Sequence, residues 1–479
     1  MEEHLLASIR QSDPSLTKLH LVFEPSAYFT DENFDAFLDL LRNNTQITYV
    51  LLERRLARAL PKTQYEELLR ALFAIPNLQE AELWSQRLSW PVLWSALQSA
   101  RRLRRLGLGL VTLTDVASIN EEAMLPHGSL EVFYLSDFKL LPASETEKEP
   151  KLDPILATLG SCEKLQRVEI FSFAMDHSAC TSVWPLLKAP SLSQVTLRRL
   201  HLSAAAVTSP SDDTILCPLR SLDVSENPLK DEGCTSVLRR VCRTKWRTTL
   251  GELNLKKTNC STGLATNLLE EFSVENDVPL ALEKISLAAN TLRDDTAKAL
   301  AHLLEQPAFK LKQLDLYRCC ITNVGMHALA EAMRQNTHLR SLGLAYNDFD
   351  DEAYVSFGSA LARDNRTLES INLQVDRKRL HKKGAMALQE MCRQNTTLKY
   401  VGTLLDTVVP HAHAKYGNSI RMCLRLNKAG RVKVESNTAT LEEWMQLLAV
   451  VSDDLFAIHF MVRTYPQYAA LAANQHRAT

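Results

Sequence analysis

The chain has 479 residues, with 55 lysines and arginines against 56 aspartates and glutamates, and a formal net charge of −1 at pH 7. This balance provides no overall field for binding nucleic acid or an anionic membrane, and 14 glycines and 18 prolines are too few for a low-complexity chain. Leucine is the exception, with 80 residues, about one in six. Such an excess predicts one packing position that is filled repeatedly, and therefore predicts repeats.

The ends of the chain and its cysteines bear on where the protein resides. The first four residues, Met1 to His4, are acidic rather than basic and apolar, so we expect no secretory signal. The most apolar late stretch, 447–462, is interrupted by Asp453, Asp454 and His459, so we expect no membrane contact. None of the ten cysteines shows the spacing of a metal site, which favours reduced thiols. We therefore expect a protein of the cytoplasm or of the nucleus.

A pattern of the form L-x-x-L-x-L-x-x-N recurs along the chain. It is clearest at 219–227, 282–290 and 339–347, and at 311–319 with Cys319 in the asparagine position. The apolar part of the pattern begins at fourteen positions spaced by about 29 residues: 16, 47, 78, 103, 130, 165, 192, 219, 250, 282, 311, 339, 368 and 398. The alternating apolar residues predict a short strand with one buried face. We expect the asparagine side chain to bond the free backbone of the turn that follows.

Helical spacing of apolar residues follows each predicted strand, as at Met326, Leu329, Ala330 and Met333. One strand and one helix cannot cover their own apolar faces, so neighbouring units must stack. The sequence therefore predicts an α/β solenoid, a curved horseshoe with parallel strands on the concave face and helices on the convex face.

Four segments are predicted along this solenoid. We expect an N-terminal cap at 1–15, irregular repeats at 16–215, regular repeats at 216–402, and a mostly helical C-terminal cap at 403–479. A capping-box pattern, Thr440-Leu-Glu-Glu443, predicts a helix start inside the last segment. Four asparagines stand three residues before a repeat start, where we expect each to close a helix in the left-handed conformation: Asn44, Asn336, Asn365 and Asn395.

The regular repeats resemble the leucine-rich-repeat superfamily, specifically its ribonuclease-inhibitor-like type. The stretches at 219–229, 282–292, 311–321 and 339–349 carry the match, which is strong over 216–402 and weaker over 16–215. In the weaker part the asparagine position is taken by Glu24, Arg55, Gln86, Val111, Phe138, Phe173 and Leu200. The resemblance implies a fold and does not by itself imply a function.

Solenoids of this type commonly bind a partner on the concave face, so the outward strand positions are candidate contacts. Aromatic and arginine side chains dominate binding energy when buried at an interface. This face includes Tyr49, Arg199 and Lys257, and the principal candidates on it are Trp84, Tyr134, Phe171, Arg198, Lys256, Tyr317, Arg318 and Tyr346. The alternative is that these side chains pack on one another.

Other chemistry finds little support in the sequence. The basic runs 101–105 and 377–383 lack interleaved aromatic residues, so we expect no nucleic-acid binding. No phosphate-binding loop, dinucleotide fingerprint or nucleophile elbow is present. His411 and His413 form a pair without a third ligand, so no metal site and no cofactor are predicted. We expect no enzyme activity.

The most economical hypothesis is a non-enzymatic scaffold or adaptor, most simply a monomer, that binds another protein on its concave face. One alternative is a regulator of a small GTPase, because Ran GTPase-activating proteins share this repeat type. Another is the sensor part of a protein of the immune-receptor kind.

Overall fold

A computed structural model describes residues 13–22, 33–53, 60–116, 127–142, 150–173, 179–208, 217–272, 278–374, 380–402, 414–453 and 455–478. The chain forms two compact units, residues 1–254 and 255–479. The predicted N-terminal cap lies outside the described residues except for 13–15, and so do His411 and His413. The boundary predicted at 215/216 concerns the change from irregular to regular repeats, whereas the boundary at 254/255 separates compact units. The boundary at 215/216 therefore stays a prediction.

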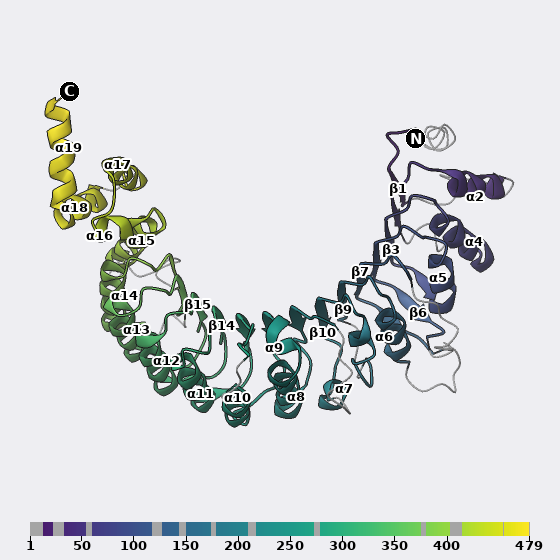
Figure 1. The fold of residues 1–479 in the computed structure, drawn as a ribbon, viewed down its shortest axis with the longest axis horizontal. Coiled ribbons are helices and arrows are strands. Elements are labelled where there is room, and N and C mark those ends of the chain that lie inside the picture. Colours follow the sequence, from purple (N-terminus) through teal and green to yellow (C-terminus); the bar gives the residue numbers. More distant parts are fainter. Residues whose placement is uncertain are drawn as a thin grey trace. The chain divides into compact units, whose positions relative to one another are not determined.

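The N-terminal unit is built on parallel strands that follow one another in chain order (Figure 1). These strands are β1 (Lys18–Leu21), β2 (Tyr49–Leu52), β3 (Glu80–Trp84), β5 (Arg105–Gly109), β7 (Val132–Ser136), β9 (Arg167–Phe171), β10 (Gln194–Arg198), β11 (Ser221–Asp223) and β12 (Glu252–Asn254). Each begins two residues after a predicted repeat start. Strands lie on one side of the unit and helices on the other (Figure 1), because inward leucines of the strands need an apolar cover.

The helical side of this unit differs from repeat to repeat in the length and type of its helices. Its helices are α2 (Phe34–Asn43), α4 (Lys62–Phe73), α5 (Trp90–Leu97), α6 (Asp153–Gly160), α7 (Ala204–Val207), α8 (Lys230–Arg243), α9 (Trp246–Thr249) and a 3₁₀ turn, η4 (Leu186–Lys188). A second small parallel sheet follows three of the main strands and comprises β4 (Arg87–Ser89), β6 (Thr112–Thr114) and β8 (Lys139–Leu140). The repeat pattern does not predict this second sheet.

The C-terminal unit continues the pattern with greater regularity. Its strands are β13 (Lys284–Ser286), β14 (Gln313–Asp315), β15 (Ser341–Gly343), β16 (Ser370–Asn372) and β17 (Tyr400–Gly402). The helices that cover them are α10 (Leu264–Phe272), α11 (Arg293–Glu305), α12 (Asn323–Gln335), α13 (Asp351–Arg363) and α14 (Lys382–Gln394). The α/β solenoid predicted from the repeats is confirmed.

The asparagine of the motif has a different role from the one predicted. The Oδ1 atom of Asn347 accepts from the backbone N–H groups of Cys319 (2.8 Å) and Ile321 (3.1 Å), one repeat earlier, and Nδ2 donates to Leu316 and Leu344 carbonyls. Asn227 and Asn290 make the same set of bonds. The side chain therefore joins two consecutive turns, because a buried turn leaves backbone groups that need partners.

The asparagines before the repeat starts do not adopt the predicted left-handed conformation. Asn336 and Asn395 are extended, with φ of −72° and −85°, and Asn44 is extended as well. Asn365 shares their bonding: its Oδ1 accepts from the Leu368 N–H at 2.8 Å, and its Nδ2 donates at 2.8 Å to the Met333 carbonyl in α12, the helix of the repeat before. The prediction was wrong because side-chain bonds, rather than a left-handed backbone, satisfy these carbonyls.

The C-terminal cap is helical, as predicted, with α15 (Ala414–Lys428), α16 (Arg431–Glu435), α17 (Leu441–Val450), α18 (Leu455–Thr464) and α19 (Pro466–Ala478). The capping box of Thr440 and Glu443 is present. Asn427 donates to the carbonyls of Leu398 (2.6 Å) and Asn395 (3.0 Å). It therefore takes the place that the asparagine of a further repeat would occupy.

Arg431 is the most unusual group in the cap, since its side chain is 0% exposed. Its Nη2 donates to the carbonyls of Asn395 (2.7 Å) and Cys392 (3.0 Å), which lie at the end of α14. A cation at the C-terminal end of a helix satisfies carbonyls that have no partner within the helix.

Among the described residues, no helix is long and apolar enough to cross a membrane.

Candidate functional site

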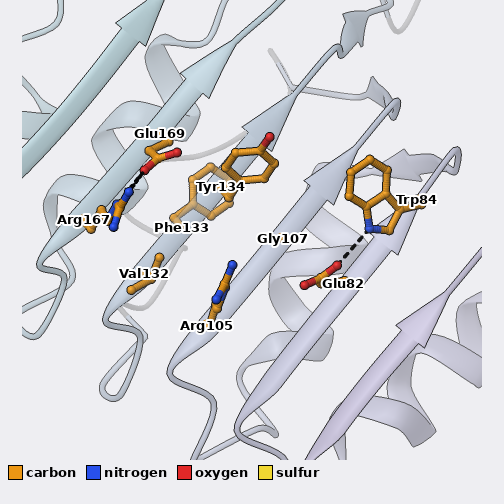
Figure 2. Close-up of a pocket in the computed structure, with 9 residues that line it drawn as sticks. All are labelled: Glu82, Trp84, Arg105, Gly107, Val132, Phe133, Tyr134, Arg167 and Glu169. Carbon is orange, nitrogen blue, oxygen red and sulfur yellow. Dashed lines mark hydrogen bonds and ion pairs between the residues drawn. The ribbon is translucent and has the colours of Figure 1, made fainter. Parts of the chain in front are cut away.

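The outward side chains of the N-terminal unit form rows across its strands. One row runs through Glu82, Gly107, Tyr134 and Glu169, which are paired from β3 to β9. Arg105 lies two residues before Gly107 and so faces the same side of the sheet. These residues line a pocket of about 420 Å³ together with Trp84, Val132, Phe133 and Arg167 (Figure 2).

Two glycines on β5 create this pocket. A Cβ at Gly109 would lie 2.4 Å from the Trp84 ring, and one at Gly107 would lie 3.3 Å from Cγ of Glu82. The indole of Trp84 therefore lies over the neighbouring strand β5 at Gly109, and any side chain at position 109 would exclude the indole from this place. The absent side chain at Gly107 leaves a hollow between Glu82 on one side and Tyr134 on the other.

The carboxylates of the pocket already have donors within the chain. The Trp84 indole N–H donates to Glu82 at 3.1 Å, and Arg167 is ion-paired with Glu169 (Figure 2). Among the described residues, by contrast, the Arg105 guanidinium and the Tyr134 hydroxyl have no hydrogen-bond or ion-pair partner. Burial raises the pKa of the neighbouring Tyr49, as do Glu82 and Glu80, while Arg105 opposes the increase.

An aromatic surface continues from the pocket towards β10. The Tyr134 and Phe171 rings meet edge to face at 5.6 Å, and Phe171 meets Phe173 in the same way at 6.3 Å. The Arg199 guanidinium lies over the Phe173 ring at 4.1 Å, a cation–π distance. Because Phe173 is 63% exposed, this surface presents a large apolar ring to the solvent.

Phe173 is exposed because its turn is one residue out of step with the others. In nine repeats the residue seven after the start has a left-handed backbone, as at Asp137 (φ 48°) and Arg199 (φ 55°). In the repeat that starts at 165, that residue is Ser172, which is buried and donates to the Phe138 carbonyl at 3.1 Å. Ser172 thus fills the buried asparagine position, and Phe173 is turned outward.

Glu226 anchors the far end of this surface. It accepts hydrogen bonds from Nε of Arg198 at 2.7 Å and from Nε of Arg199 at 2.6 Å. Burial opposes ionisation of this carboxyl, but the two guanidinium groups outweigh that effect and lower its pKa. Glu226 thereby holds the Arg199 guanidinium over the Phe173 ring and fixes how the two side chains stack.

The predicted contacts divide into two groups. Trp84 and Tyr134 line one pocket, Phe171 contacts Tyr134, and Arg198 shares Glu226 with Arg199. The others belong to the C-terminal unit.

In the C-terminal unit, Tyr317 and Tyr346 meet edge to face at 5.3 Å, and the Tyr346 hydroxyl accepts a bond from Gln374 at 2.9 Å. Tyr346 is nevertheless 48% exposed. Arg318 is exposed and Lys256 is half-buried. The two rings thus combine mutual packing with an accessible surface.

Four parts of the site were not predicted from the sequence: the glycines at 107 and 109, the exposed Phe173, the charged pocket residues, and Glu226. The alternating glycines of Arg105-Leu-Gly-Leu-Gly109 were the available signal, because they stand at outward strand positions. Phe173 was identified only as a departure from the asparagine position.

Cysteine chemistry at the motif position is disfavoured. Cys319 is buried, and its burial, as the largest influence, raises the pKa of its thiol to about 12. A thiol with this pKa is protonated at neutral pH and is a weak nucleophile. Cys319 therefore acts as a packing residue in the turn.

Comparison with known proteins agrees with the geometry. A family model described as "Leucine Rich repeat" matches residues 216–238, 308–330 and 335–357. Human NACHT, LRR and PYD domains-containing protein 5 is 27% identical over 294 residues, covering 59% of this chain but 23% of that protein. Pig ribonuclease inhibitor is 27% identical over 297 residues, covering 59% of this chain and 60% of that protein. An internalin from Listeria monocytogenes is 16% identical with a TM-score of 0.45, covering 79% of this chain and 94% of that one.

The fold and the family-model match over three segments define these repeats as a leucine-rich-repeat solenoid. Its repeats are of the ribonuclease-inhibitor-like type, since strand and helix alternate with a period of about 29 residues and the asparagine positions join consecutive turns.

Proposed function

We propose that this chain is a non-enzymatic protein-binding repeat protein, and that its partner contacts the strand side of the N-terminal unit. The observation that carries the proposal is the pocket walled by Trp84 and Tyr134 and extended by Phe171 and Phe173. Aromatic residues beside a desolvated pocket are the groups that contribute most to protein–protein affinity. The repeat relatives support a binding role without identifying the partner.

Site-specific crosslinking tests this proposal. A photoreactive benzoylphenylalanine replaces Phe173, which is exposed on the strand side, and in a control it replaces Thr63, which is exposed on helix α4. We expect one cellular protein to crosslink from position 173 and not from 63. A Trp84→Ala, Tyr134→Ala double variant should reduce its yield at least tenfold. Equal crosslinking from both positions, or an unchanged yield in the double variant, would contradict the proposal.

A second candidate function is a sensor role within a larger assembly. Its support is the similarity to proteins named for NACHT, LRR and PYD domains, of which this chain spans about a quarter. Under this hypothesis the partner from the crosslinking experiment would carry a nucleotide-binding module. Identification of the crosslinked protein by mass spectrometry separates the two candidates.

A further inference from the structure

We propose that the pocket between Trp84 and Tyr134 recognises an acidic side chain, Asp or Glu, of a partner protein segment, with Arg105 as its counter-ion. The inference rests on the proposed function and specifies the chemistry of the partner. It predicts that the segment also places an apolar side chain next to the carboxylate, against the Trp84 indole.

The position of the donors supports this assignment. Gly107 is paired with Tyr134 on β7 and with Glu82 on β3, so the hollow above it lies between these two side chains. Arg105 is exposed on the same face of β5, where it is paired with Val132 on β7 and with Glu80 on β3, and in Figure 2 its side chain lies between those of Val132 and Glu82. A carboxylate above Gly107 would therefore meet the guanidinium of Arg105 and the hydroxyl of Tyr134.

The hydrogen-bond accounting favours an anion over a cation. The carboxylates of Glu82 and Glu169 accept bonds from Trp84 and Arg167, whereas no acceptor within the described ranges is bonded to Arg105 or Tyr134. A bound carboxylate would supply an acceptor to both donors, and charge-assisted bonds of this kind are among the stronger ones. Glu80 at the rim makes a basic ligand the rival, which the experiment must exclude.

Short amidated peptides provide the test, since amidation leaves only side-chain carboxylates. Three fluorescein-labelled peptides carry a phenylalanine next to a central Glu, Gln or Lys, and their binding to the full chain is measured by fluorescence anisotropy. We expect the Glu peptide to bind at least tenfold more tightly than the Gln and Lys peptides. Arg105→Gln should abolish this preference. Arg104→Gln, the matched control at an arginine that faces Glu131 at 3.7 Å, should retain it.

A filling variant tests the pocket independently of its charge. Gly107→Val leaves Arg105 in place but occupies the hollow, and the neighbouring Glu82 needs to yield by only a few tenths of an ångström at the first added carbon. It should weaken the Glu peptide at least tenfold while thermal stability stays close to wild type.

Several outcomes overturn the inference: tightest binding of the Lys peptide, a Glu preference that survives Arg105→Gln, or absence of Glu-peptide binding at millimolar concentration. These failures are distinguishable from failure of the proposed function. If the crosslinked partner is lost with Trp84→Ala, Tyr134→Ala but retained with Arg105→Gln, partner binding stands and the acidic preference does not.

Discussion

Replacing Gly109 by alanine is the sharpest perturbation of the site, because it adds one methyl group beneath the Trp84 indole. The new Cβ would lie 2.4 Å, 2.5 Å and 2.8 Å from three carbons of that ring. These distances are shorter than van der Waals contact, and the ring must rotate away. Its hydrogen bond to Glu82, 3.1 Å in the wild type, is lost with the rotation.

The expected cost divides unequally between stability and binding. Trp84 is only half-buried, so rotation relieves the clash, and the lost hydrogen bond corresponds to about 1 kcal/mol of unfolding free energy. Loss of an aromatic anchor costs about 2 kcal/mol of binding free energy, roughly a 30-fold decrease in affinity. We therefore expect a nearly normal melting curve with severely weakened partner binding.

Fluorine NMR measures the ring movement directly. The chain contains six tryptophans, and labelling with 5-fluorotryptophan gives a signal that Trp84→Phe assigns by its disappearance. Gly109→Ala should shift this signal and leave the other five in place. Gly251→Ala is the control, because a Cβ there would lie 3.7 Å from the Arg220 carbonyl, an ordinary contact. An unshifted Trp84 signal together with unchanged affinity would refute the role assigned to Gly109.

Three further predictions concern other parts of the chain. The pKa of Glu226 is lowered, so the ionised carboxylate contributes fully to stability above the ordinary pKa near 4.5, and this contribution is lost as the pH falls through the lowered pKa. In Glu226→Gln, the free energy of unfolding measured in urea should therefore depend less on pH over this acidic range. An unchanged pH dependence would contradict the ion pairs assigned to Glu226. The double variant Tyr317→Ala, Tyr346→Ala should lower the free energy of unfolding by about 1 kcal/mol, since one edge-to-face pair is lost from a partly exposed site. A large fall in the melting temperature would show instead that the two rings belong to the core. Arg431→Met should destabilise the C-terminal unit by about 3 kcal/mol, because buried carbonyls lose their donor. Faster amide hydrogen exchange in α14 would measure this loss. The control is Arg421→Met, at an exposed arginine of α15.

Turn chemistry was predicted less well than strand position. Asn336 was expected to be left-handed, from the tolerance of asparagine for that conformation. Instead it is extended, and its side chain donates to the Leu304 carbonyl at 2.7 Å and accepts from Leu339 at 2.7 Å. The bond to Leu304 depends on the neighbouring repeat, 32 residues away, so local propensity does not predict it.

The sequence by itself determined the repeats, the strands and the type of solenoid. Alternating leucines specify a strand through contacts within a few residues, and their repetition requires stacking, so all fourteen predicted starts precede a strand by two residues. It also identified Trp84 and Tyr134 as outward-facing side chains.

Only the tertiary structure decided that these two side chains wall one pocket. The hollow exists because Gly107 and Gly109 are paired with residues about 25 positions before and after them. Likewise, Phe173 is exposed because Ser172 occupies the buried place beside Phe138. Both features arise from packing between neighbouring strands. The residue pattern within one repeat does not specify which side chains of the next repeat will lie beside it.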